Sequence, residues 1–225
     1  MSPTQLPLDL PFRATAGHGE FIVSRCNQFA ADTIGQWPDW VGQIRAVNLV
    51  GPDGAGKTHL ASVWQEMSEA KILDRLDPVK MDSIEGGYFI LENMTPGPDW
   101  DETSLFLLLN RVKDEGGGVV ATSRQPLSQM AWALPDLRSR LRAFTVAEIA
   151  APDDQLLLAL LQKYFVERQL AVPDQVLHYL VTRMERSFAT VTAVASALDR
   201  QSLAGNRQIN LGLARDVLSE LNDAE

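Results

Sequence analysis

Residues 46–58 read AVNLVGPDGAGKT, and this stretch decides the fold. Its first five residues form a largely apolar run that is typical of a buried parallel strand. The next eight fit the pattern G-x-x-x-x-G-K-[ST] at every fixed position. Residues 58–69 are good helix formers with an apolar face at Leu60, Val63 and Trp64. This order of strand, glycine-rich loop and helix is the context that a phosphate-binding loop requires, so we predict one at residues 51–58.

The residue types of this loop define its expected chemistry. Glycines let backbone N–H groups curl around phosphates, and the following helix N-terminus adds partial positive charge. We expect Lys57 to bridge the β and γ oxygens and Thr58 to ligate Mg²⁺. Glu92, after a strand expected at 88–91, is the candidate acid for the magnesium water shell. Asn93 stands where many ATPases carry a second acid, and an amide cannot accept a proton at neutral pH, so we expect weak intrinsic hydrolysis. The alternative is that Glu92 and Asn93 form only a polar strand end.

Two further groups are candidates for contact with phosphate. Thr122 and Ser123 end the strand expected at 119–122, where their hydroxyls would point toward the γ-phosphate, although strands often end in Ser or Thr by chance. Residues 137–142 read LRSRLR and place three arginines at alternate positions. Such arginines act in trans on a neighbour's nucleotide as arginine fingers, or they form surface ion pairs.

The pattern along the rest of the chain predicts an α/β core followed by a helical unit. Further strands are expected at 71–73 and 143–146, and a further core helix at 102–113. Apolar residues then recur at helical spacing over 156–170, 176–184, 191–203 and 211–221. We therefore expect an extended arm at 1–12, a nucleotide-binding α/β core with a parallel sheet at 13–149, and a small all-helical lid at 150–225.

Composition narrows the classes of function. The chain has 225 residues, and no apolar run approaches the roughly 18–20 residues of a membrane span, so we expect a soluble protein. The N-terminus lacks the pattern of a secretory signal, and Cys26 is the one cysteine, so the cytoplasm is the expected location. The net charge of −9 disfavours direct binding to duplex DNA.

Several strings resemble the AAA+ proteins of the bacterial replication initiator DnaA and its shorter paralogue Hda. Residues 51–61, GPDGAGKTHLA, resemble the extended phosphate loop of this family. Phe21-Ile22-Val23 with Asn27 resembles the segment that lines the adenine pocket, and residues 136–141, DLRSRL, are similar to the arginine-finger box, which maps the finger onto Arg140. The resemblance implies ADP or ATP with Mg²⁺, ADP being favoured. The nucleotide-binding residues that it implies are Ile22, Val23, Gly51, Asp53, Gly54, Ala55, Gly56, Lys57, Thr58 and His59.

Two features are more similar to Hda than to DnaA. The sequence ends after the expected lid, without the DNA-binding domain of the initiator, which agrees with the acidic charge. Residues 5–10, QLPLDL, resemble the hexameric sliding-clamp-binding motif of Hda. In such a motif the amide of Gln5 would anchor an extended peptide, and Leu6, Leu8 and Leu10 would fill an apolar pocket of the clamp. The alternative is an arm without a partner.

Two positions depart from the family pattern. The second sensor arginine of the lid falls on Ala189, which puts nucleotide-dependent lid closure in doubt unless Arg183 or Arg186 replaces it. Glu92-Asn93 stands in place of the paired aspartates of the initiator, which weakens the case for an autonomous ATPase.

The resemblance implies a negative regulator of chromosomal replication initiation. Such a protein would bind the β sliding clamp of DNA polymerase III, stimulate hydrolysis of the ATP bound to DnaA, and associate with the nucleoid and replisome. A second copy of the chain is a further candidate partner, whereas direct specific DNA binding and membrane binding are not expected. The alternative class is an autonomous AAA+ ATPase of the helicase-loader type; a small-molecule phosphotransferase is less favoured because no substrate-binding acid or arginine-rich lid loop is evident.

Overall fold

A computed structural model describes residues 21–42, 44–84, 87–205 and 207–222 of the chain. Within these residues lies a sheet of five parallel strands in the order β2-β3-β4-β1-β5. The strands are β1 Arg45–Val50, β2 Lys71–Leu73, β3 Tyr88–Leu91, β4 Gly118–Ser123 and β5 Thr145–Glu148. Because all strands are parallel, their carboxyl ends lie at one edge, where the loops that follow β1, β3 and β4 meet.

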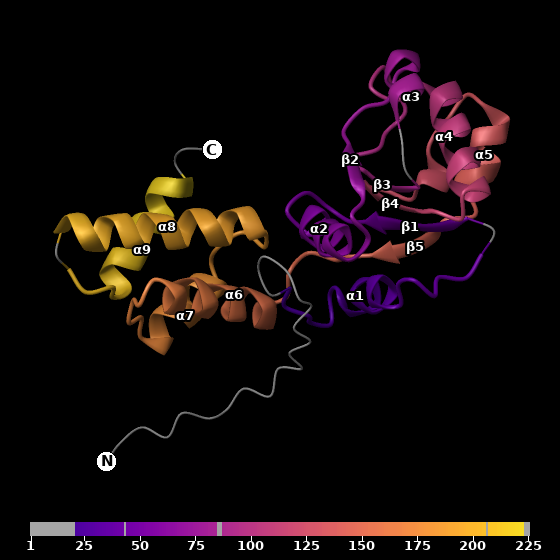
Figure 1. Cartoon of the computed structure of the whole chain (residues 1–225). Coiled ribbons are helices and arrows are strands. Elements are labelled where there is room, and N and C mark those ends of the chain that lie inside the picture. Colours follow the sequence, from indigo (N-terminus) through magenta and orange to yellow (C-terminus); the bar gives the residue numbers. More distant parts are fainter. Residues whose placement is uncertain (1–20, 43, 85–86, 206, 223–225) are drawn as a thin grey trace.

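Helices cover both faces of the sheet (Figure 1). Helices α1 (Gln28–Gly35) and α2 (Lys57–Ser68) pack on one face, and α4 (Glu102–Asp114) and α5 (Pro135–Leu141) pack on the other, with α3 (Pro78–Ser83) beside α4. Side chains of β4 alternate between the two layers: Val120 joins the cluster under α1 and α2, and Val119 and Ala121 join the cluster under α4 and α5. Every residue of β4 is buried, which explains the apolar run Val119–Ala121 that precedes Thr122 and Ser123.

Four helices form the C-terminal lid: α6 Asp154–Glu167, α7 Asp174–Val181, α8 Phe188–Gly205 and α9 Leu211–Asn222. They enclose a separate apolar cluster that includes Leu161, Phe165 and Leu198. Asp153 caps α6 by accepting a 2.8 Å hydrogen bond from Leu156 N, and Ser187 Oγ accepts one of 3.0 Å from Thr190 N at the start of α8. The lid thus has its own core and defined helix starts, and it lies beside the sheet in Figure 1.

The predicted strands agree with the structure except for the last one. Residues 71–73 and 88–91 match β2 and β3, whereas the strand expected at 143–146 begins only at Thr145 and continues to Glu148. A strand at this edge of the sheet is confirmed, but its predicted start was wrong because Ala143 N and Phe144 N hydrogen-bond back to Arg140 O and Leu141 O, at 3.1 and 3.3 Å. These two residues complete the turn after α5 and are not extended. No helix of the described residues is long and apolar enough to cross a membrane.

Candidate nucleotide site between the core and the lid

The glycines of the phosphate loop occupy positions that other residues would not fit. A Cβ at Gly51 would lie 2.2 Å from the carbonyl oxygen of Ile149, which follows β5. Only glycine therefore fits where these two backbone segments approach each other. Gly54 and Gly56 have φ angles of +69° and +95°, a left-handed conformation that L side chains adopt at a cost. The first turn of α2 carries no side-chain cap, which leaves its N–H groups available to an anion. The loop therefore fits a phosphate group.

Lys57 lies buried at the centre of this loop. Its Nζ donates hydrogen bonds of 2.8 Å to each of the carbonyl oxygens of Gly51 and Pro52. Burial lowers the pKa of the Lys57 ammonium from its ordinary value; the Asp53 carboxylate counteracts this shift, and the Arg124 guanidinium adds to it. A phosphate anion beside Nζ would supply the negative charge that this desolvated cation lacks.

Three predicted site residues meet at the carboxyl ends of β3 and β4. Glu92 Oε2 accepts hydrogen bonds from Thr58 Oγ1 at 3.1 Å and from Thr122 Oγ1 at 2.7 Å, and Thr122 Oγ1 accepts one of 2.8 Å from Asn93 N. The hydroxyl of Thr58 and the carboxylate of Glu92 are hard oxygen ligands of the kind that Mg²⁺ prefers. The described residues contain no group of three His, Cys, Asp or Glu that could hold a metal. A magnesium ion here would therefore depend on phosphate and water oxygens as well.

Ser123 is directed differently from Thr122, because successive strand residues point to opposite faces. Its Oγ accepts a 2.8 Å hydrogen bond from Asn48 Nδ2 and donates one of 2.8 Å to Gln125 O. Asn48 Oδ1 in turn accepts a 3.0 Å hydrogen bond from Leu127 N. This buried network fixes the loop after β4. The two hydroxyls that the sequence paired as sensors are thus separated: Thr122 contacts Glu92, and Ser123 orders the loop.

The segment predicted to line the adenine pocket lies between the core and the lid. Phe21 makes an edge-to-face contact with His59 at 5.3 Å, which joins the segment to α2 directly after the phosphate loop. Ile22 packs against Leu156 and Ala159 of α6, and Val23 is half-buried against the core. Asn27 Nδ2 also donates a 3.0 Å hydrogen bond to Ile22 O and holds the segment in place. A base bound here would touch both units.

The lid also rests directly on the phosphate loop. Phe188 N, at the start of α8, donates a 3.1 Å hydrogen bond to Gly54 O, and a Cβ at Gly56 would lie 3.0 Å from Phe188 Cε2. Phe188 and the loop line a cavity of about 300 Å³. Ala189, where the family resemblance places the sensor arginine of the lid, is exposed. The two possible replacements are engaged within the lid: Arg186 pairs with Asp154 at 2.7 Å, and Arg183 lies 4.2 Å from the ring centre of Tyr179.

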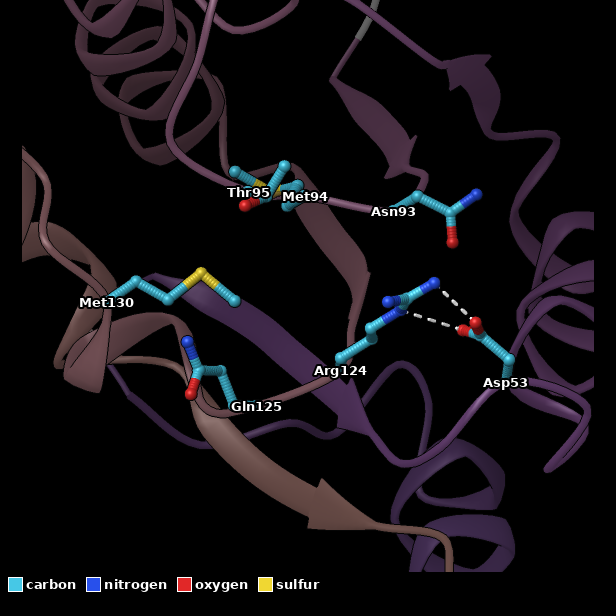
Figure 2. A pocket seen from close by; sticks show the side chains of 7 residues that line it. All are labelled: Asp53, Asn93, Met94, Thr95, Arg124, Gln125 and Met130. Atoms are coloured by element: carbon cyan, nitrogen blue, oxygen red, sulfur yellow. Dashed lines mark hydrogen bonds and ion pairs between the residues drawn. The ribbon is translucent and has the colours of Figure 1, made fainter.

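Arg124 is a residue of the site that the sequence analysis missed. It follows Thr122 and Ser123, and its Nε donates a 3.0 Å hydrogen bond to Asp53 Oδ1, while a second guanidinium nitrogen pairs with Oδ2 (Figure 2). The sequence did offer a signal for this residue, because Arg124 directly follows the expected sensor pair Thr122 and Ser123. The pair borders a second cavity of about 740 Å³, whose lining residues are Asp53, Asn93, Met94, Thr95, Arg124, Gln125 and Met130.

Arg140 is half-buried near the end of α5, between the exposed Arg138 and Arg142. Within the described part of the chain its guanidinium makes no hydrogen bond or ion pair, so its charge is available to a partner. Gln5, Leu6, Leu8 and Leu10 of the expected clamp-binding motif lie outside the described residues.

Comparisons with known proteins agree with this architecture. Residues 153–218 match the family model described as "Hda, lid domain". Domain III of the Thermotoga maritima replication initiation protein DnaA is similar with a TM-score of 0.74 at 18% identity, over 96% of this chain and 98% of that one. The RuvB Holliday junction branch migration motor of Thermotoga maritima is similar with a TM-score of 0.65 at 15% identity, over 86% of this chain and 66% of that one.

Two other comparisons agree with the same architecture. The replication initiator DnaA bound to AMPPCP and single-stranded DNA has a TM-score of 0.67 at 15% identity, over 82% of this chain and 65% of that one. An uncharacterized protein of Haemophilus influenzae is 25% identical over 187 residues, which covers 75% of this chain and 79% of that protein. The predicted AAA+ fold with a helical lid is confirmed, and so is the resemblance to the Hda family, which the match of the lid carries.

Proposed function

From a lid that matches the Hda family on a DnaA-like AAA+ core, we propose that this chain is a negative regulator of chromosomal replication initiation of the Hda type. It would dock against ATP-bound DnaA and stimulate hydrolysis of that ATP. The observation that carries the proposal is the Hda lid placed directly on a complete phosphate loop, through the bond from Phe188 N to Gly54 O. A nucleotide held in that loop would contact both units and so fix the surface that meets DnaA.

The nucleotide of this chain would be ADP or ATP with Mg²⁺, and the family resemblance favours ADP. Lys57 and the loop amides would hold the phosphates, and Ile22, Val23 and His59 would lie at the base. Thr58 and Glu92 would orient the magnesium ion, whose chemistry is to neutralise phosphate charge. Asn93 supports a binding role over turnover, because its amide cannot accept a proton from an attacking water at neutral pH.

Arg140 would act in trans on the nucleotide of DnaA. An arginine finger stabilises charge that develops on the transferred phosphoryl group, and in GTPases such a residue contributes roughly 10³–10⁵ in rate. Support for this role comes from the half-buried position of Arg140 on α5 and from its match to the finger box. A second copy of this chain is the other candidate recipient of the finger.

The N-terminal arm would tether the protein to the β sliding clamp of DNA polymerase III and bring it to the replisome in the cytoplasm. Support for this step comes from the string QLPLDL alone. An extended peptide with one amide anchor and a few apolar anchors suits an arm that becomes ordered on binding.

The test is a reconstituted assay that measures hydrolysis of the ATP bound to DnaA. It contains DnaA, clamp loaded on DNA, and this chain with bound ADP. We expect the chain to accelerate hydrolysis, Arg140→Ala to remove most of the acceleration, and Arg138→Ala, on the exposed side of the same helix, to leave it. A Gln5→Ala, Leu8→Ala variant should not bind the clamp in calorimetry. It should fail to stimulate the hydrolysis of DnaA-bound ATP only under conditions in which that stimulation depends on the clamp. Full stimulation by an Arg140→Ala protein that still binds DnaA would reject the finger assignment.

The same assay separates the proposal from an autonomous ATPase. Steady turnover of ATP by the isolated chain, with no effect on DnaA, would favour an enzyme of the helicase-loader type and remove the regulator from consideration. The isolated chain is therefore assayed first, without DnaA or clamp.

A further inference from the structure

The ion pair between Asp53 and Arg124 lies between two cavities beside the phosphate loop (Figure 2). Asp53 and Asn93 line both the 300 Å³ cavity over the loop and the neighbouring 740 Å³ cavity, and Arg124 lines the second. Figure 2 shows Arg124 reaching from the end of β4 to Asp53 in the loop. An anion that extends out of the loop cavity toward the larger one would meet this pair.

Both members of the pair act electrostatically on the phosphate-binding cation. The Asp53 carboxylate raises the pKa of Lys57, and the Arg124 guanidinium lowers it. Coulombic interaction falls with distance and with screening, so charges that affect Lys57 lie close to it. A phosphate bound beside Lys57 would therefore also interact with Asp53 and Arg124.

The pair is suited to exchange of partners. Its side chains are 78% exposed for Arg124 and 66% exposed for Asp53, and an ion pair in water contributes little stability. A guanidinium binds carboxylate and phosphate oxygens with the same forked geometry. A phosphate group can therefore replace Asp53 at Arg124 with little loss, but it must then lie beside the displaced carboxylate.

We propose that the Asp53–Arg124 pair selects between nucleoside diphosphates and nucleoside triphosphates. A diphosphate fills the loop and leaves the pair closed, whereas the third phosphate of a triphosphate must take Arg124 from Asp53. The carboxylate thus disfavours the triphosphate in two ways, because it occupies the guanidinium and repels the terminal phosphate. This inference rests on the proposed nucleotide-binding function and gives its preference for ADP a physical cause.

The test is calorimetric binding of ADP and of AMPPCP, both with Mg²⁺, to the full chain. We expect the intact chain to bind ADP more tightly. Asp53→Asn keeps the shape of the side chain and removes its charge, so the affinity ratio should shift toward AMPPCP by about two- to fivefold. Arg124→Gln should weaken the binding of AMPPCP more than the binding of ADP. Asp199→Asn, which removes one charge from the partly buried Arg168–Asp199 pair of the lid, is the control for loss of a carboxylate elsewhere and should leave the ratio unchanged.

The double variant Asp53→Asn, Arg124→Gln separates the selector from simple repulsion. If Asp53 acts partly through Arg124, removal of its charge should increase AMPPCP affinity less in the Arg124→Gln background than in the intact chain, because only the relief of repulsion remains. An equal gain with and without Arg124 would overturn the exchange of partners. Binding of both nucleotides with a ratio that Asp53→Asn does not move would overturn the selector and leave the nucleotide function standing. Absence of binding to either nucleotide would instead remove the proposed function itself.

Discussion

The contact of the lid with the phosphate loop can be measured through Gly54. Its φ is +69°, and a Cβ there would lie 2.9 Å from Ser187 Cβ, closer than real Cβ contacts. In Gly54→Ala the left-handed conformation costs about 1–2 kcal/mol. The overlap with the lid adds about 1–3 kcal/mol, as overpacking does elsewhere. We therefore expect the free energy of unfolding to fall by about 2–5 kcal/mol in total.

The chain offers a matched control for the conformational part of this cost. Gly116 has a φ of +68°, and nothing lies within 4 Å of a Cβ placed there. Gly116→Ala therefore carries the backbone strain without the overlap, and the difference between the two variants measures the contact with the lid. Ser187→Gly removes the overlapping atom and, as an N-cap change to glycine, costs only a few tenths of a kcal/mol. The pair Gly54→Ala, Ser187→Gly should recover about 1–3 kcal/mol.

Urea unfolding with two probes provides the measurement. The five tryptophans all precede residue 150, so their fluorescence reports on the core, whereas far-ultraviolet circular dichroism also reports on the lid helices. In Gly54→Ala we expect a lower midpoint by fluorescence than in Gly116→Ala. Equal effects of the two glycine variants, with no recovery in the double variant, would refute the lid contact in solution.

Three other perturbations test separate parts of the structure. Lys57→Met should abolish the stabilisation by saturating ADP, which is about 2.7 kcal/mol at a hundredfold excess over Kd, in thermal melts; an unchanged shift would contradict the loop assignment. Thr122→Val leaves the amide of Asn93 without its acceptor and should cost about 1–3 kcal/mol in urea unfolding, and no cost would contradict that contact. Leu161→Ala, fully buried in the lid, should cost about 2–5 kcal/mol by circular dichroism and leave the fluorescence transition of the core in place.

The sequence predicted the sheet well because most of its strands are buried on both faces. The centre of a strand such as β4 needs apolar residues on both faces, and such a run is visible without knowledge of its neighbours. The start of β5 was predicted wrongly, since Ala143 and Phe144 are apolar and suited to a strand but complete a turn after α5. Apolar character alone does not tell a turn from a strand.

Short helices escaped prediction for a related reason. Helix α5 has seven residues and buries only Leu137 and Leu141, too few positions to define a helical period. Pro135 at its first position was the available signal, because proline is suited to the start of a helix. Because Arg140 lies on this helix, the sequence analysis named the candidate finger without predicting the element that carries it.

Residues of the candidate site that end a recognisable loop, or that end or follow a recognisable strand, could be named from the sequence, as Thr58, Thr122 and Glu92 were. The contact between Asp53 and Arg124 could not. Asp53 and Arg124 are 71 residues apart, and their contact depends on the parallel pairing of β1 with β4. Single-sequence patterns carry no information on such pairs.

The contact of Phe188 with the loop changes what the missing lid arginine means. A sensor arginine of the lid would contact phosphate by charge, whereas Ala189, the position expected for it, has no polar side-chain group and is exposed. The lid is nevertheless joined to the loop through Phe188 N and Gly54 O, one residue away. This bond would respond to the orientation of the loop peptide, because phosphates bound to the N–H groups of the same loop would set that orientation. We therefore expect the position of the lid to depend on whether the loop is filled, and the number of phosphates to be distinguished in the core, at Asp53 and Arg124.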